Sequence, residues 1–79
     1  MFEIDIKQSA YKHGCTYNDI MNCYRSPIVT KILALDESKY LYIGFDMKGR
    51  PIELLVNQNG ISVIFHAMKL RKTFEKLIN

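Results

Sequence analysis

The chain has 79 residues, 48% of them hydrophobic and 24% charged, which indicates one folded domain over residues 1–79 and excludes an intrinsically disordered segment. It has no apolar run near the roughly 20 residues that a membrane-spanning helix needs, and its acidic, alternating start lacks the order of a signal peptide, so we expect a cytoplasmic protein without a membrane partner. The formal net charge of +3 lies entirely in residues 66–79, because residues 1–65 carry seven cations and seven acids.

The N-terminal part of the chain is predicted to be mainly helical. Residues 2–6 alternate apolar and acidic side chains, which fits either a short edge strand or the entry to a helix. The clearest helix begins at Thr16, which forms a capping-box pattern with Asp19, and it ends before Pro27. Its apolar stripe is predicted to consist of Tyr17, Ile20, Met21 and Tyr24.

Four strand-like runs follow this helix. They cover residues 28–35, 40–46, 52–57 and 61–65. The connections are a polar turn at 36–39, a turn at 48–51, and Asn59-Gly60, which is the strongest hairpin signal in the chain. All three connections are too short for helical crossovers, so the sequence predicts an antiparallel meander.

A final helix is predicted over residues 68–78, with Leu70, Phe74, Leu77 and Ile78 as its apolar stripe. The expected fold class is therefore α+β. It combines an N-terminal helical segment, a four-stranded antiparallel meander sheet and a C-terminal helix packed on that sheet.

The usual catalytic templates are absent from the sequence. We find no glycine-rich phosphate loop, no metal-ligand spacing and no nucleophile elbow, so we expect neither a metal nor a cofactor. The spacing of Cys15 and Cys23 fits neither a zinc site nor a redox dithiol, and both are interpreted as free thiols.

The two histidines are the candidate proton-transfer groups. An imidazole can take or give a proton near neutral pH, so His13 or His66 beside Arg71 and Lys69 would have the parts needed for RNA cleavage. The cations would hold the charge that develops on the phosphate. The structural alternative is that each histidine caps a helix end or bonds to the backbone.

Other charged residues also have both a functional and a structural interpretation. Glu53 and Asp46 fall on the sheet face opposite the aliphatic one, with Arg50 in the turn between them. A carboxylate there could act as a base or orient a cation, whereas exposed carboxylates are also common on half-solvated antiparallel sheets. Lysines along the last helix either bind phosphate or keep the protein soluble, and Lys76 fits only the second role.

Two stretches together resemble a known family. Tyr-Lys-His-Gly-Cys-Thr at residues 11–16 leads into an acidic helix, and His-Ala-Met-Lys-Leu-Arg at residues 66–71 follows the closing strand. In this order they resemble the BrnT-like toxins of bacterial type II toxin–antitoxin systems, within the RelE/ParE-like ribonucleases. Tyr42-Ile-Gly44 and the strand–turn–strand through Gly49 are also similar.

The resemblance implies a compact α+β ribonuclease that cuts RNA without a metal, inhibits translation and is neutralised by a cognate antitoxin, often a DNA-binding repressor. Lys12 and His13 match the N-terminal motif, and Lys69 and Arg71 match the basic segment. In this chain His66 replaces a common serine. Met68 stands where an arginine is frequent, so Arg50 or Lys72 would have to supply that charge.

We therefore expect a toxin-like, metal-independent endoribonuclease acting by acid–base catalysis. Its catalytic residues are expected to be His66, His13, Arg71 and Lys69, and its substrate-binding residues Lys12, Arg50, Lys72 and Glu53. The alternative is a non-catalytic module that binds nucleic acid or a partner protein through the basic C-terminal segment and the outer sheet face. That face carries Leu55, Ile64 and two tyrosines, which is compatible with a homodimer or an antitoxin surface.

Overall fold

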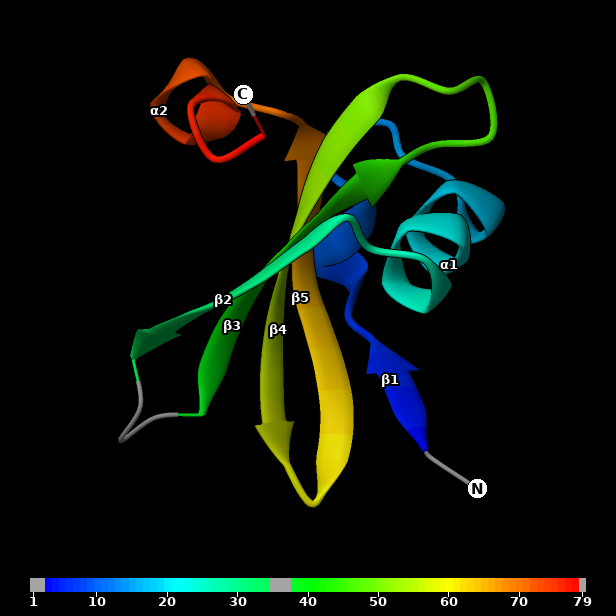
Figure 1. The fold of residues 1–79 in the computed structure, drawn as a ribbon. Coiled ribbons are helices and arrows are strands. Elements are labelled where there is room, and N and C mark those ends of the chain that lie inside the picture. The colour runs from blue at the N-terminus through cyan, green and yellow to red at the C-terminus, as the bar shows by residue number, and fades with distance from the viewer. Residues whose placement is uncertain (1–2, 35–37, 79) are drawn as a thin grey trace.

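Figure 1 shows the computed structural model of the chain, which describes residues 3–34 and 38–78. Phe2, Leu35 and turn positions 36 and 37, all included in predicted elements, lie outside the described residues. The strands are β1 (Ile4–Ile6), β2 (Val29–Ala34), β3 (Lys39–Phe45), β4 (Pro51–Asn59) and β5 (Ile61–Lys69). The helices are the 3-10 turn η1 (Gln8–Tyr11), α1 (Tyr17–Arg25) and α2 (Lys72–Glu75).

The five strands form one mixed sheet in the order β1-β5-β4-β3-β2. The strands β2 to β5 run as consecutive antiparallel neighbours, whereas β1 pairs in parallel with β5, Ile4 lying opposite Ser62 and Ile6 opposite Ile64. The predicted four-stranded antiparallel meander behind an N-terminal helical segment is therefore wrong. Residues 4–6 gain strand geometry from a partner almost sixty residues away, which local periodicity does not reveal.

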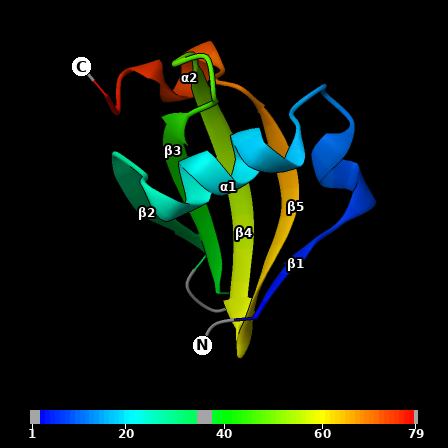
Figure 2. The same cartoon turned by 90° about the vertical axis from the view of Figure 1, so that its right-hand side faces the viewer.

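Helix α1 lies across one face of the sheet, as Figure 2 shows. It begins as predicted, because Thr16 and Asp19 form both bonds of a capping box, Thr16 N to Asp19 Oδ2 at 2.9 Å and Asp19 N to Thr16 Oγ1 at 3.1 Å. The predicted stripe is only partly right. Tyr17 is 54% exposed, and the buried face is rotated toward Cys23, which is fully buried with Ile20.

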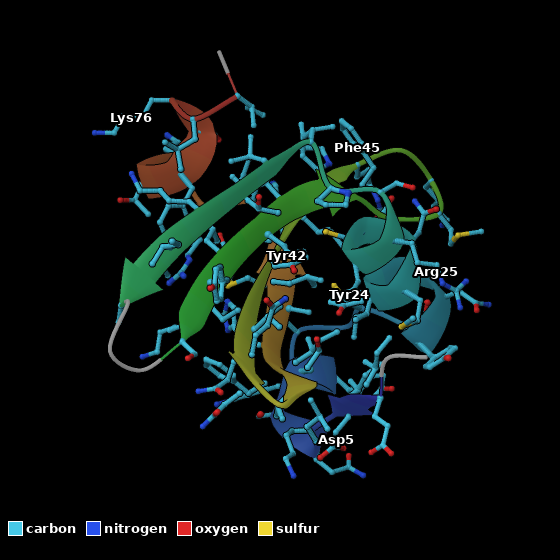
Figure 3. All side chains as sticks on the ribbon, turned by 60° about the horizontal axis from the view of Figure 1, so that its bottom comes forward. Asp5, Tyr24, Arg25, Tyr42, Phe45 and Lys76 are labelled. Atoms are coloured by element: carbon cyan, nitrogen blue, oxygen red, sulfur yellow. The ribbon has the colours of Figure 1, made fainter. Side chains whose placement is uncertain are left out.

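The main core lies between α1, η1 and the sheet. Its buried members are Ala10, Ile20, Cys23, Ile52, Leu54, Val56, Ile64 and Ala67. Gly44 of β3 permits α1 to approach closely, because a Cβ there would lie 2.9 Å from Cys23 Sγ. Tyr24 of α1 stacks on Tyr42 of β3, with ring centroids 5.3 Å apart (Figure 3). Tyr42 is thus part of the helix–sheet packing and not of the expected outer sheet face.

The opposite face of the sheet is covered by the C-terminal segment. Leu41, Ile43 and Leu70 are buried there, with Leu55, Phe74, Leu77 and Ile78 packed against them. The predicted stripe does contact the sheet, but the predicted helix over 68–78 is wrong in extent. Residues 66–69 continue β5 because they pair with β4, and only Lys72–Glu75 form α2.

Part of the second sheet face is therefore covered too, which corrects the expectation of a half-solvated outer face at these positions. Ile64 belongs to the main core and Leu55 packs beneath the C-terminal segment, so neither forms an outer surface. The exposed large apolar side chains of the described residues lie elsewhere, and three of them, Ile28, Ile32 and Leu33, lie in the edge strand β2 or just before it. Among the described residues, no helix is long and apolar enough to cross a membrane.

Candidate active site

Glu53 is a fully buried carboxylate at the centre of a polar cluster. Strand β4 places it on the face covered by the C-terminal segment, opposite Met68 of β5. Arg71 donates to it from its backbone N (2.9 Å to Oε1), from Nε (2.9 Å to Oε2) and from Nη2 (2.6 Å to Oε2). A buried carboxylate needs such charged and hydrogen-bonding partners, so the cluster explains how Glu53 is tolerated inside the fold. The expectation of an exposed carboxylate at this position is wrong.

His66 is the fourth donor to this carboxylate. Its Nε2 lies 3.1 Å from Glu53 Oε2, and its side chain is 19% exposed. A carboxylate only accepts hydrogen bonds, so Nε2 carries the proton, and in the neutral ring Nδ1 is left with a free lone pair. His66 lies within β5, three residues before the strand ends, rather than at the predicted strand–helix junction.

His13 comes from the loop between η1 and α1 and packs edge-on against His66. The two ring centroids are 5.7 Å apart at an interplanar angle of 68°. After β1 ends, the chain stays attached to the edge of β5 through Lys7 and η1. Lys7 N donates to Ile64 O (2.9 Å), and Ser9 Oγ donates to Phe65 O (2.6 Å). This attachment carries the exposed His13 to the edge of β5 beside His66.

His13 also lines a cavity of about 360 Å³. It is lined by His13, Gly14, Cys15, Asp19, Asp46, Arg50, Pro51, Ile52 and Lys69. Asp46 also organises the β3–β4 turn, because its Oδ1 accepts from the backbone N of Lys48 (2.9 Å) and of Arg50 (2.8 Å) while Oδ2 accepts from Arg50 Nε (2.8 Å). Two of the predicted site residues, Arg50 and Lys69, thus meet His13 at this cavity.

Hydrogen bonds keep both carboxylates at the cavity ionised. Backbone donation from Met47 N, followed by donation from Thr16 N, lowers the pKa of Asp19. Burial raises the pKa of Asp46, but the hydrogen bonds from Arg50 and Lys48 outweigh that effect and hold it below its ordinary value. The two carboxylates are therefore already occupied by donors of the fold.

The sheet separates residues that the sequence grouped together. Lys69 lies opposite Ile52, a core residue beneath α1, whereas His66 lies opposite Leu55, which packs under the C-terminal segment. Lys69 is thus on the α1 face, and the Glu53–His66–Arg71 cluster is on the other. His13, at the edge of β5, borders both His66 and the cavity.

Arg71 does not present the free fork expected for a phosphate. Its Nε and Nη2 both bind Glu53, and this hydrogen bonding raises the pKa of its guanidinium. The group also lies 5.3 Å from the centre of the Phe74 ring. Its main structural role is to pair with the buried carboxylate, and three of its five N–H donors remain for other contacts.

Lys12 and Lys72 are not brought into either cluster. Both are exposed, Lys12 just after η1 and Lys72 at the start of α2. Within residues 3–34 and 38–78, no hydrogen bond or ion pair described for the structure joins them to His13, His66 or Arg71.

The thiols are poorly suited to nucleophilic chemistry. Burial raises the pKa of Cys15, which lines the cavity, and raises that of the buried Cys23 to about 12. Since the thiolate is the reactive form, neither cysteine is activated. The described part of the chain contains no group of three or more His, Cys, Asp or Glu side chains arranged to hold a metal ion.

Comparison of the chain with protein-family models, with curated protein sequences and with solved structures finds no match. The geometry of these residues is therefore the basis on which a function is proposed.

Proposed function

We propose that the protein is a toxin-like endoribonuclease, similar to the BrnT-like toxins, that cleaves RNA by acid–base catalysis with His66 and His13. The observation that carries the proposal is the arrangement of the two imidazoles. One is held by a fully buried carboxylate, and the other is exposed and packed edge-on against the first, 5.7 Å away. A carboxylate that binds one ring nitrogen of a histidine fixes its tautomer and leaves the other nitrogen for chemistry.

Each group has a role in this reaction. Nδ1 of His66 takes the proton of the RNA 2′-hydroxyl, whose oxygen then attacks the adjacent phosphorus. The bond between phosphorus and the 5′-oxygen breaks, and protonated His13 gives that oxygen its proton. The products are a 2′,3′-cyclic phosphate and a free 5′-hydroxyl, and the two histidines end in exchanged protonation states.

Cations near His13 support this scheme by offering charge for the phosphate. Arg50 has a side chain that is 67% exposed, and it lines the same cavity as Lys69. We assign phosphate binding to these two residues and the positioning of Glu53 to Arg71. Met68 stands where the BrnT-like toxins often have an arginine. In this assignment Arg50, from the turn before β4, supplies the missing positive charge.

The biological setting follows from the resemblance and is part of the same proposal. The protein would act in the cytoplasm and be neutralised by a cognate antitoxin. The exposed apolar side chains Ile28, Ile32 and Leu33, at and just before the edge strand β2, support a protein partner there, since an edge strand offers backbone groups for pairing with another chain.

The proposal is tested by incubating the purified protein with a structured and an unstructured RNA in the presence of EDTA. We expect cleavage products with 2′,3′-cyclic phosphate ends, and no cleavage of the same RNA with 2′-O-methyl groups throughout. Salt-dependent RNA binding without any cleavage would instead favour the non-catalytic module. Cleavage of the methylated RNA would contradict the mechanism.

A further inference from the structure

The cavity beside His13 has the size and lining of a site for one small anionic ligand. Its volume of about 360 Å³ falls at the lower end of the roughly 300–1,000 Å³ that is usual for small-molecule sites. Such a volume fits one nucleotide and not a longer stretch of RNA. Ile52, which is 3% exposed, and Pro51 supply an apolar wall.

The cations at the cavity are more available to a ligand than its carboxylates are. Two carboxylates line it, but Asp46 is bound by Arg50 and Lys48, and Asp19 is bound by Thr16 and Met47. Lys69 is exposed, and Arg50 binds Asp46 through Nε, so that bond does not use its two terminal nitrogens. A ligand with a flat apolar part and a phosphate would match the apolar wall and the two cations together.

The position of the cavity relates it to the proposed reaction. His13 lines it and also packs against His66, so a group held in the cavity lies next to His13, which in turn contacts the His66 ring. Resting on the proposed ribonuclease activity, we propose that the cavity binds the base and phosphate of one nucleotide adjacent to the cleaved bond. Lys69 and Arg50 hold the phosphate, and the base lies against Pro51 and Ile52.

A second cavity in the described structure provides an internal comparison. It has about 340 Å³ and is lined by Tyr24, Tyr42, Gln58, Gly60, Ile61 and Ser62. Its hydroxyl groups are already paired, since Tyr24 Oη bonds to Ser62 Oγ at 2.7 Å and Gln58 donates to Tyr42 Oη. None of its lining residues is charged, so it should not attract a nucleotide.

The test is a titration of the 15N-labelled protein with the four ribonucleoside 3′-monophosphates and, separately, with inorganic phosphate. We expect the amide signals of Gly14, Cys15 and Ile52 to shift with at least one nucleotide, and those of Gly60 and Ser62 to stay. Lys69→Gln and Arg50→Gln should each weaken nucleotide binding about tenfold or more, since each removes a charge-assisted hydrogen bond. Lys76→Gln, which changes the net charge equally, is the matched control.

Several outcomes would overturn the proposal. They are the absence of shifts at Gly14 and Cys15, equal affinity for nucleotide and inorganic phosphate, and equal weakening by Lys76→Gln. The same titration with His66→Ala separates this inference from the activity. Nucleotide binding at the cavity in a protein that cleaves no RNA would leave the binding site standing and remove the ribonuclease. Cleavage without nucleotide binding at the cavity would leave the ribonuclease standing and remove the binding site.

Discussion

Nε2 of His66 lies 3.1 Å from Oε2 of Glu53, and the same carboxylate oxygen is bound by the Arg71 guanidinium. The three residues come from β4, from β5 and from the segment that joins β5 to α2. Because the carboxylate is fully buried, it has no solvent to replace these partners. The orientation of the His66 ring is therefore coupled to the folding of the C-terminal segment.

Replacing this carboxylate should destabilise the fold. Glu53→Gln keeps the volume but turns one acceptor oxygen into a donor that faces the donors of Arg71 and His66, so we expect the free energy of unfolding to fall by about 1–3 kcal/mol. Urea unfolding measures the change. The exposed Glu75→Gln on α2 should stay within about 0.5 kcal/mol of the parent. Equal stability of Glu53→Gln and the parent would contradict the role given to Glu53.

The close approach of α1 to β3 makes Gly44 intolerant of a side chain. The Cβ of Gly44→Ala would lie 2.9 Å from Cys23 Sγ and 3.2 Å from Cys23 Cα, and such overpacking costs about 1–3 kcal/mol. Thermal or urea unfolding would show the loss. In a Cys23→Ala background the same substitution should cost less, since the Sγ contact is gone. A full-sized loss in both backgrounds would mean that the clash is with the backbone alone.

Acid should weaken the attachment of the β3–β4 turn to α1. Hydrogen bonds from Met47 and Thr16 lower the pKa of Asp19 in the folded state below its unfolded value of about 3.9. Its contribution to stability is thus present above that pH and is lost as the pH falls through the folded-state pKa. Asp19→Asn should be less stable than the parent at pH 7, and the gap should narrow toward pH 3. An equal difference in stability between Asp19→Asn and the parent at pH 7 and at pH 3 would contradict this role of the Asp19 carboxylate.

The two thiols should differ in reactivity. Cys15 is half-buried at the cavity, whereas Cys23 is fully buried and burial raises its pKa to about 12. Iodoacetamide at pH 8 should therefore label Cys15 slowly and Cys23 only after unfolding. Peptide mass spectrometry distinguishes the two sites. Labelling of both cysteines at one rate in the native protein would show that α1 opens more readily than its packing implies.

Local signals in the sequence predicted the elements that local interactions determine. The Thr16–Asp19 capping box and the hairpin at Asn59-Gly60 are both present, because each depends on neighbours within a few residues. The strand β1 depends on β5, far along the chain, and its three residues carry no periodicity that separates strand from helix. The end of β5 was missed for the same reason, since pairing with β4 overrides the helical spacing of Leu70, Phe74 and Leu77.

The histidines and several cations of the candidate site were identified from residue type alone, whereas their grouping was not. Counting back from the Asn59-Gly60 hairpin would have placed Glu53 close to residues 66–68, and this register is the signal that could have found the Glu53–His66 pair. The bulge between Leu55 and Val56 shifts the register by one, and a bulge is not visible in local pattern. The burial of Glu53 follows from the packing of the C-terminal segment on its sheet face, which only the three-dimensional fold determines.

The central claim is that His66 and His13 transfer the protons of RNA cleavage. Single-turnover cleavage of one RNA by the parent, His66→Ala, His13→Ala and Lys76→Ala, all checked for equal folding, tests it most directly. We predict that each histidine substitution lowers the rate constant by about 10²–10⁴-fold, while Lys76→Ala leaves it unchanged. Cleavage by both histidine variants at the rate of the parent would contradict the account.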